Sequence, residues 1–233
     1  MMDSPRSALI TGGSTGLGLA TARHLAGLGL GVTVTGRTPS TLDAAVAELA
    51  DAGADVVGVV ADAAEWPDNE RSVAEHVAHH GGLDVVVANA GFTAAGDLAD
   101  GAPDQWRAMV LTNVLGPALL VRAALPHLTT PGGQIVLVGS VAGRIVRPGS
   151  LYGVTKAAVA ALGENLRPQL TASGIRVALV EPGITDTPFW GEAGAPPFAL
   201  EATAIAEAVG WIVGQPAGVD VNELLVRPVG QPI

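Results

Sequence analysis

The stretch SALITGGSTGLGLATARHLAGLG, residues 7–29, joins a short apolar run to a segment whose apolar residues have helical spacing. Four glycines stand at the junction: Gly12, Gly13, Gly16 and Gly18. Glycine permits positive φ angles and leaves main-chain N–H groups open to a ligand at a helix N-terminus, where the helix dipole favours anions. A tight, closely packed turn would use the same glycines, and the pattern alone leaves the two interpretations level. The order of strand, glycines and helix favours a turn that binds the pyrophosphate of a dinucleotide.

Short β-branched runs alternate with helical segments along the rest of the chain. Strands are predicted at residues 7–11, 31–35, 55–60, 83–88, 134–139, 176–181 and 221–227, and helices at 16–28, 41–52, 69–80, 104–128, 152–172 and 200–213. Strict alternation predicts an α/β fold, with a parallel, doubly wound, seven-stranded sheet in a three-layer α/β/α sandwich. We expect one domain over residues 1–233, with a mobile Gly/Pro-rich loop at about residues 184–199. Ligands of such sheets bind beyond the carboxyl ends of the strands, so functional residues are expected just after them.

The composition excludes several classes of protein. Hydrophobic residues make up 48% of the chain and charged residues 15%, which suits a sheet covered on both faces. The formal net charge of −10 argues against a general nucleic-acid surface, and the lack of cysteine excludes disulfides and thiolate chemistry. Apolar runs are shorter than the roughly 20 residues of a membrane-spanning helix or are interrupted, and the first residues do not resemble a signal peptide. We therefore expect a cytoplasmic protein that does not enter a membrane.

Further motifs follow the predicted strands at regular places. The glycine turn has the spacing TGxxxGxG, formed by Thr11, Gly12, Gly16 and Gly18. The later motifs are Asn89-Ala90-Gly91, Asn113, Ser140, Tyr152-xxx-Lys156, and Pro182-Gly183 with Thr187. In this combination and order, the chain resembles the short-chain dehydrogenase/reductase family over nearly its whole length. The resemblance implies a Rossmann-like fold and an NAD(P)-dependent oxidoreductase that interconverts a ketone or aldehyde and an alcohol.

Tyr152 and Lys156 are four residues apart, so a helix would place both side chains on one face. A phenol has a pKa of about 10, and a nearby ammonium would lower it towards the range useful for proton transfer. Ser140 can donate a hydrogen bond to a carbonyl oxygen. The resemblance implies that Tyr152 is the general acid/base and that Lys156 holds the nicotinamide ribose and lowers the tyrosine pKa. It also implies that Asn113 anchors a water leading from Lys156 to solvent.

The end of the second predicted strand favours NADP(H) over NAD(H). An acidic residue there would bind the ribose 2′-hydroxyl of NAD, whereas Gly36 is followed by Arg37, which could bind the 2′-phosphate of NADP. Arg37 could also be a solvated surface charge. The resemblance implies that Asp62 binds the adenine amino group, but this residue could instead cap a helix. The predicted cofactor-binding residues are Gly12, Ser14, Thr15, Gly16, Leu17, Gly18, Arg37, Thr38, Asp62, Ala63, Asn89, Ala90, Gly91, Tyr152, Lys156, Pro182, Gly183, Thr185 and Thr187.

The predicted substrate contacts are Ser140, Arg147, Phe189 and Trp190. Phe189 and Trp190 lie on the Gly/Pro-rich loop, which the resemblance places over the substrate, although a packed surface loop is about as probable. Arg144 and Arg147 could face an anionic substrate or water. His76, His79 and His80 have a spacing that could hold a metal, but an exposed polar helix face is the better interpretation, and no metal site is expected.

Two alternatives differ in function. A dinucleotide-binding sensor or scaffold could use the same fold without catalysis, although such a protein would not need Ser140, Tyr152, Lys156 and Asn113 together. An epimerase or dehydratase would be longer, with a separate C-terminal substrate region. The resemblance implies a dimer or tetramer, and the apolar-rich segments 104–128 and 152–172 are compatible with a homodimer or homotetramer built through them.

Overall fold

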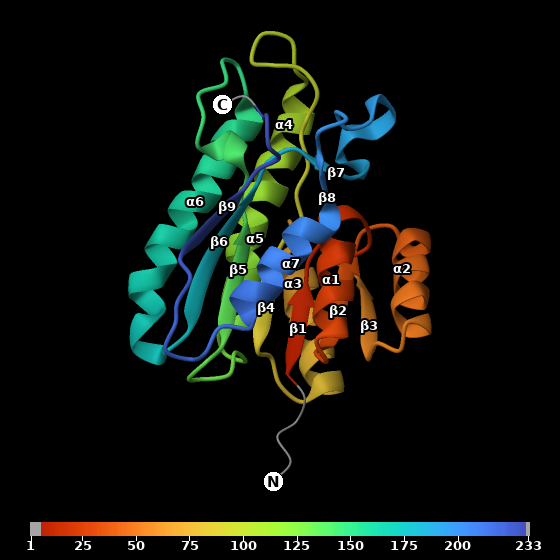
Figure 1. The fold of residues 1–233 in the computed structure, drawn as a ribbon, viewed down its shortest axis with the longest axis vertical. Helices are drawn as coiled ribbons and strands as arrows, with labels where there is room; N and C mark the ends of the chain where they lie inside the picture. The colour runs from red at the N-terminus through yellow and green to blue at the C-terminus, as the bar shows by residue number, and fades with distance from the viewer. Residues whose placement is uncertain (1–5, 232–233) are drawn as a thin grey trace.

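A parallel sheet of seven strands forms the centre of the molecule, which is described over residues 6–231 by a computed structural model (Figure 1). The strands are β1 (Ser7–Ile10), β2 (Gly31–Gly36), β3 (Val56–Val60), β4 (Val85–Ala88), β5 (Gln134–Val138), β6 (Arg176–Pro182) and β9 (Glu223–Val226). Their spatial order is β3-β2-β1-β4-β5-β6-β9. The chain therefore winds outward from β1 in one direction and from β4 in the other, as a doubly wound sheet does.

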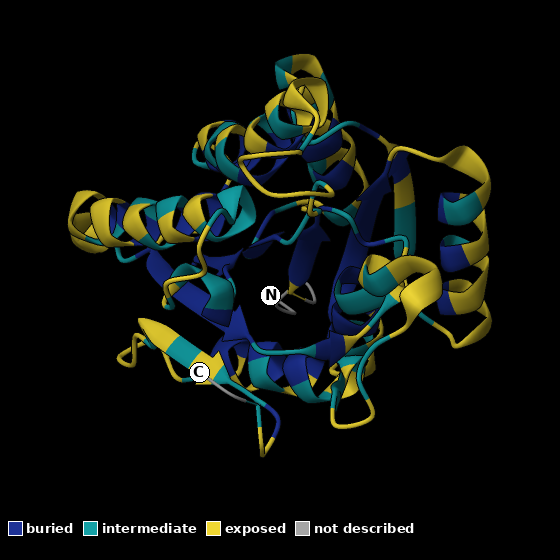
Figure 2. Cartoon of the chain, turned by 90° about the horizontal axis from the view of Figure 1, so that it is seen from above, coloured by how far each residue is buried: buried dark blue, intermediate teal, exposed yellow. Residues whose placement is uncertain are grey.

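Helices cover both faces of this sheet. One buried apolar cluster joins the sheet to α1 (Gly16–Gly27), α2 (Pro39–Asp51) and α7 (Ala202–Val213). A second cluster on the opposite face joins it to α3 (Trp66–His80), α5 (Gly116–Ala124) and α6 (Leu151–Leu170). Figure 2 shows the buried strands at the centre, surrounded by helices whose outer faces are exposed. The predicted Rossmann-like α/β/α sandwich is confirmed.

The predicted helix at 104–128 is divided into three segments. These are α4 (Pro103–Val110), a π-helical turn η1 (Leu111–Leu115) and α5, so the predicted boundaries are too late at both ends. Together they form one helix, Pro103–Ala124, which by length and composition alone could cross a membrane, contrary to our expectation from the apolar runs. About 50% of its most apolar window is buried inside the domain, as in the core helix of an α/β protein.

The Gly/Pro-rich loop contains regular structure that the sequence pattern did not predict. Its short strand β7 (Thr185–Asp186) pairs in parallel with β8 (Leu200–Glu201), and the 3-10 segment η4 (Pro188–Ala193) lies between them. Because β8 takes the first two residues of the predicted helix 200–213, α7 begins at Ala202. The pairing of β7 with β8 thus connects the start of the loop to the residues directly before α7.

The histidines of α3 do not form one exposed face. His76 is fully buried, with Nδ1 2.9 Å from Thr33 Oγ1 and Nε2 3.0 Å from Ser7 Oγ. The prediction is therefore wrong for His76, and also for His80, whose side chain is 3% exposed. It holds for the exposed His79. The physical reason is that two of the three imidazoles lie on the side of α3 that packs on the sheet.

His79 and His80 both contact the carboxylate of Asp55, and they do not form a site together with His76. His79 Nε2 lies 2.8 Å from Asp55 Oδ1, and His80 Nδ1 lies 3.2 Å from Asp55 Oδ2. A metal-ligating imidazole ordinarily donates its other N–H to an acceptor, yet His80 Nε2 is buried without a hydrogen-bond partner among the described residues. The geometry favours hydrogen bonds between these two imidazoles and Asp55, and the hydrogen bond from His79 is the main cause that lowers the pKa of Asp55.

Burial of His76 predicts an acid-sensitive stability. Desolvation lowers the pKa of His76 to about 4, from an unfolded value of 6.5. The unfolded chain therefore binds more protons between these values, so stability falls as pH drops from 6.5 towards 4, by at most about 1.4 kcal/mol per pH unit. Between pH 7 and pH 5, we expect the free energy of unfolding, measured by chemical denaturation, to fall by about 2 kcal/mol less in His76→Gln than in wild type. The exposed His127→Gln control should keep the wild-type pH dependence, and equal slopes in all three proteins would contradict the prediction.

Candidate active site

The segments expected to be functional meet at the carboxyl edge of the sheet. The glycine turn follows β1, Asn89-Ala90-Gly91 follows the neighbouring β4, and Ser140 and Gly183 follow β5 and β6. Because β1 and β4 are where the winding reverses, this edge contains the crevice in which open α/β sheets bind ligands. The structure therefore brings together residues that lie as much as 170 positions apart in the sequence.

At its glycine positions, the turn has no side chains that would cover the main chain. Gly12 and Gly16 have φ angles of 64° and 53°, in the left-handed region that favours glycine. A Cβ on Gly18 would overlap the carbonyl oxygen of Gly12. The first N–H groups of α1 receive no side-chain cap, so they remain available to an anion at the positive end of the helix.

Two other predicted segments hold this turn. Asn89 Nδ2 donates hydrogen bonds to the carbonyl oxygens of Thr11 (2.9 Å) and Gly12 (3.2 Å). On the other side, a Cβ on Gly16 would lie 3.3 Å from Thr187 Cβ. Asn89 thus holds the main chain of the turn in place. Thr187 borders the space next to the turn, and this arrangement suits a bound pyrophosphate.

Tyr152, Lys156, Ser140 and Asn113 gather beside the turn. Tyr152 and Lys156 extend from one face of α6, with the Lys156 nitrogen 5.9 Å from the centre of the Tyr152 ring. Ser140 lies two residues after the end of β5, and its Oγ accepts a hydrogen bond from Ala142 N (3.1 Å). Gly91 allows the main chain to approach closely, because a Cβ there would lie 3.1 Å from Asn113 Oδ1 and 3.5 Å from Lys156 Nζ.

Asn113 lies in the π-helical turn η1, a distortion that is frequent at functional sites. Its Oδ1 accepts from Phe92 N (3.0 Å), and its Nδ2 donates to Phe92 O (2.9 Å) and to Thr155 Oγ1 (3.1 Å). Thr155 Oγ1 in turn donates to the carbonyl oxygen of Tyr152 (2.7 Å). The sequence analysis missed Phe92 and Thr155; the position of Thr155 inside the YxxxK motif was the only available signal.

The pKa values in the site are set by burial. Desolvation lowers the pKa of Lys156 to about 8, and its Nζ donates to Val138 O (2.8 Å). Desolvation also raises the pKa of Tyr152, and a hydrogen bond with Ser140 opposes this rise. Burial therefore sets the direction of the tyrosine pKa shift, and Ser140 is the group that opposes it; a lowering of this pKa by Lys156 stays a prediction.

The expected adenosine end contains Arg37, whose side chain is 60% exposed. Its guanidinium lies 5.9 Å from the centre of the Phe92 ring, and Nη1 is 3.9 Å from Asp62 Oδ2. Asp62 Oδ1 accepts a hydrogen bond from Ala64 N (2.9 Å) in the turn before α3, and Asp62 does not cap that helix, whose N-cap residue is Glu65. A Cβ on Gly36 would lie 2.7 Å from Ser14 Oγ, so Ser14 occupies the space that a larger residue at position 36 would need.

The predicted substrate contacts separate into two groups. Phe189 lies beside Tyr152, with the two ring centres 5.6 Å apart. Trp190 meets Phe189 edge to face, and its Nε1 donates to Thr185 O (2.9 Å). Arg147 is exposed and forms no ion pair with the described residues. Arg144 is paired with a carboxylate: its Nε donates to both carboxylate oxygens of the buried Glu181 at 2.7 and 2.9 Å, while 39% of its side chain remains exposed. The expected exposure of Arg144 to water therefore holds only in part, and no sequence spacing marked Glu181 as its partner.

Comparisons with known proteins agree with this arrangement. The family model described as short chain dehydrogenase matches residues 6–196. An uncharacterized oxidoreductase of Staphylococcus epidermidis is 32% identical over 229 residues, covering 95% of this chain and 96% of the relative. The human dehydrogenase/reductase SDR family member 4 is 37% identical over 185 residues, covering 78% of this chain and 66% of the relative.

Solved structures show the same fold. An alcohol dehydrogenase from Thermococcus sibiricus, complexed with 5-hydroxy-NADP, superposes with a TM-score of 0.90 at 31% identity, over 98% of both chains. A metagenomic short-chain oxidoreductase in complex with NADP gives a TM-score of 0.81 at 30% identity, over 96% of this chain and 97% of the other. With the family match, the relatives and the site in agreement, this chain belongs to the short-chain dehydrogenase family and is an oxidoreductase.

Proposed function

We propose that the protein is an NADP(H)-dependent oxidoreductase that reduces a ketone or aldehyde to an alcohol, or catalyses the reverse reaction. The observation that carries the proposal is the convergence of Ser140, Tyr152 and Lys156 beside a glycine turn suited to a pyrophosphate. The bound nicotinamide supplies or accepts the hydride, and the protein supplies binding, orientation and proton transfer.

Four side chains have separate roles in binding the substrate and transferring the proton. Ser140 donates a hydrogen bond to the substrate oxygen and stabilises the negative charge that develops on it. Tyr152 gives its hydroxyl proton to that oxygen in reduction and takes a proton from the alcohol in oxidation. Lys156, whose pKa is about 8, is charged at neutral pH and favours the phenolate once it forms, since an ammonium stabilises a nearby negative charge. Phe189 covers Tyr152 with an apolar ring and helps to exclude water from the reaction.

The proposed reaction is tested by consumption of NADPH in the presence of a chemically diverse panel of ketones and aldehydes. We expect turnover of some members, and a kcat about 100-fold lower but still measurable in Ser140→Ala. Tight binding of NADPH without turnover of any member would instead support the dinucleotide-binding sensor.

A preference for NADP(H) is supported by the surroundings of Arg37. Its guanidinium is held near Asp62 and Phe92 but remains mostly exposed, so it is available to a phosphate. Gly36 occupies the position of the acidic residue expected for NAD, and Ser14 lies where the Cβ of such a residue would need room. Solved relatives also contain NADP, among them a short-chain dehydrogenase from Burkholderia cenocepacia.

Replacement of Arg37 should weaken the binding of NADPH but not that of NADH. A hydrogen bond to a charged group contributes about 1.5–3 kcal/mol, so we expect Arg37→Ala to raise the KM for NADPH by about 10- to 100-fold. The KM for NADH should be unchanged, because NADH has no 2′-phosphate. Steady-state kinetics with both cofactors check this, with the exposed Arg147→Ala as the matched control. Equal loss with NADH and NADPH would contradict the assignment.

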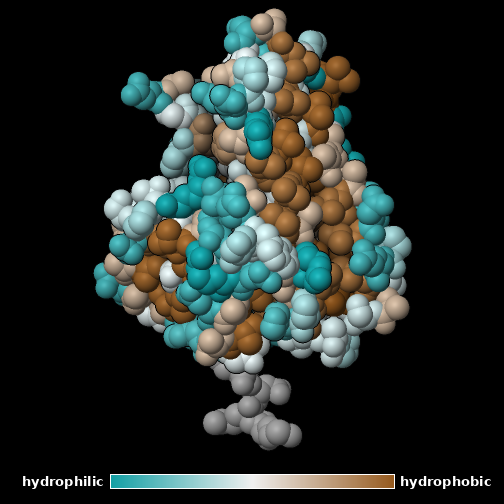
Figure 3. Space-filling model, turned by 180° about the vertical axis from the view of Figure 1, so that it is seen from behind, coloured by the Kyte–Doolittle hydropathy of each residue, from teal (hydrophilic) through white to brown (hydrophobic). Residues whose placement is uncertain are grey.

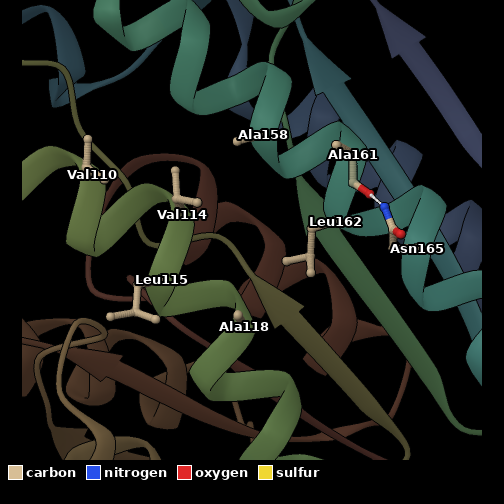
Figure 4. Close-up of a pocket in the computed structure, with 8 residues that line it drawn as sticks. All are labelled: Val110, Val114, Leu115, Ala118, Ala158, Ala161, Leu162 and Asn165. Carbon is tan, nitrogen blue, oxygen red and sulfur yellow. Dashed lines mark hydrogen bonds between the residues drawn. The ribbon is translucent and has the colours of Figure 1, made fainter.

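We also propose that the chain forms a homodimer or homotetramer through the outer face of α4, η1, α5 and α6. An apolar groove lies between these helices, lined by Val110, Val114, Leu115, Ala118, Ala158, Ala161, Leu162 and Asn165 (Figure 4). Seen from behind, apolar side chains form a broad band on the molecular surface (Figure 3). Burying such a face against a second copy removes it from water. The cytoplasmic location expected from the sequence stays a prediction.

A charge in this groove should break the assembly. Leu115 is 41% exposed, and in a face-to-face dimer Leu115→Asp would bury an unpaired carboxylate. We expect sedimentation velocity to show a smaller particle for Leu115→Asp than for wild type. Val219→Asp is the matched control, since Val219 is also 41% exposed but lies outside the groove. A wild-type monomer, or an unchanged assembly in Leu115→Asp, would contradict the proposed interface.

A further inference from the structure

Glu181 is a buried carboxylate directly before the predicted cofactor segment Pro182-Gly183. Its side chain is 1% exposed, and Arg144 provides its ion-pair partner through Nε, at 2.7 and 2.9 Å. Arg144 Nη2 also lies 2.6 Å from Glu223 Oε2 on β9. These carboxylates raise the pKa of Arg144, so the guanidinium is permanently charged and is held at the ends of β6 and β9.

Arg144 is also the last residue of the short turn that begins at Ser140. Gly143 N donates to Ser140 O (2.9 Å), and Arg144 N donates to Val141 O (2.9 Å). Ser140 Oγ accepts from Ala142 N within the same turn. Because the turn is hydrogen-bonded from end to end, displacement of Arg144 would move the main chain at Ser140.

The opposite side of this turn rests directly on α6. A Cβ on Gly143 would lie 2.7 Å from the carbonyl carbon of Lys156, and a Cβ on Gly153 would lie 2.9 Å from Ala142 O. Before the turn, Gly139 N donates to Val180 O (2.7 Å), and a Cβ on Gly139 would lie 3.1 Å from Glu181 Cγ. The turn is therefore confined between α6, which carries Tyr152, and the Arg144–Glu181 ion pair.

We infer that Arg144 is a positioning residue, and that its ion pair with Glu181 sets the place of the Ser140 hydroxyl relative to the Tyr152 hydroxyl. The inference rests on the proposed carbonyl reduction, in which both hydroxyls must bind one substrate oxygen. A misplacement of about 1 Å in such an arrangement can reduce the rate about 100-fold. Arg144 itself touches no reacting atom in this arrangement; it acts through Ser140.

A double-mutant cycle with Ser140 tests this inference in the full-length protein. We expect Arg144→Met to lower kcat by about 10- to 100-fold, while the KM for NADPH stays close to wild type. In a Ser140→Ala background the same substitution should have little further effect, because the hydroxyl that it displaces is already absent. Arg23→Met, which removes an exposed ion pair between α1 and Glu48 of α2, should leave kcat unchanged. An equal loss in both backgrounds would show a merely structural role and overturn the inference.

A spectroscopic measurement avoids dependence on turnover. Tyr152 is the only tyrosine, so tyrosine labelled with carbon-13 at Cζ gives a single NMR resonance from this ring. We expect Arg144→Met to shift that resonance in the same direction as Ser140→Ala, and Arg23→Met to leave it in place. If Arg144→Met does not fold, Glu181→Gln, which keeps a hydrogen-bonding partner for Arg144, should give a smaller shift of the same sign. A wild-type resonance in the folded Arg144 or Glu181 variant would overturn the inference, whereas absence of carbonyl turnover in wild type would overturn only the proposed function.

Discussion

Tyr152→Phe is expected to reduce kcat for carbonyl reduction by about 1,000-fold, within the range of about 100- to 10,000-fold for loss of a general acid or base. Phenylalanine keeps the ring that packs against Phe189, so the fold and the covering loop should be retained. Burial raises the pKa of Tyr152, which keeps the hydroxyl protonated at neutral pH and ready to donate. Stopped-flow measurement of NADPH oxidation with an active substrate checks the loss.

The control for this variant is Trp211→Phe, because Trp211 is 55% exposed on α7 and lies outside the site. Its kcat should equal that of wild type. NADPH should still bind Tyr152→Phe, as measured by fluorescence titration. Full activity in Tyr152→Phe would mean that the proton comes from another group, and would contradict the role proposed for Tyr152.

Lys156→Met is expected to lower activity and raise stability at the same time. Loss of the ammonium removes the stabilisation of the phenolate, and we expect kcat to fall by at least about 100-fold. The buried lysine has a pKa of about 8, against 10.5 for a lysine in water, which corresponds to a cost of about 3 kcal/mol at neutral pH. Methionine would leave Val138 O without its hydrogen bond, which costs about 1 kcal/mol. A net gain of about 1–2 kcal/mol in the free energy of unfolding follows.

The pH dependence identifies the cause of this gain. Between pH 8 and 10.5 the unfolded chain binds more protons at Lys156 than the folded chain does, so wild-type stability rises relative to Lys156→Met. The advantage of the variant should therefore be full below pH 8 and shrink above it. Denaturation with urea at pH 7 and at pH 9.5 measures the difference. A variant less stable than wild type at both values would contradict the assigned cost of burying Lys156.

Local sequence determined the framework of the protein. β-branched runs and helical spacing set the seven strands and the two helical layers, because each pattern depends on neighbouring residues only. The glycine turn was predicted for the same reason, and its positive φ angles at Gly12 and Gly16 are the conformations that glycine permits. The position of the site also followed from the order of strands and helices, since a parallel sheet brings the carboxyl ends of its strands to one edge.

Only the tertiary structure decided which side chains share an environment. The burial of His76 under β1 and β2 depends on how α3 packs, which its helical spacing does not specify. The raised pKa of Tyr152 reflects the desolvation of the whole site, whereas the YxxxK spacing reports only the neighbouring lysine. Arg144 and Glu181 are 37 positions apart and meet because β5 and β6 are adjacent in the sheet. Sequence patterns record contacts along the chain, while burial and long-range ion pairs are fixed only when the sheet and helices are assembled.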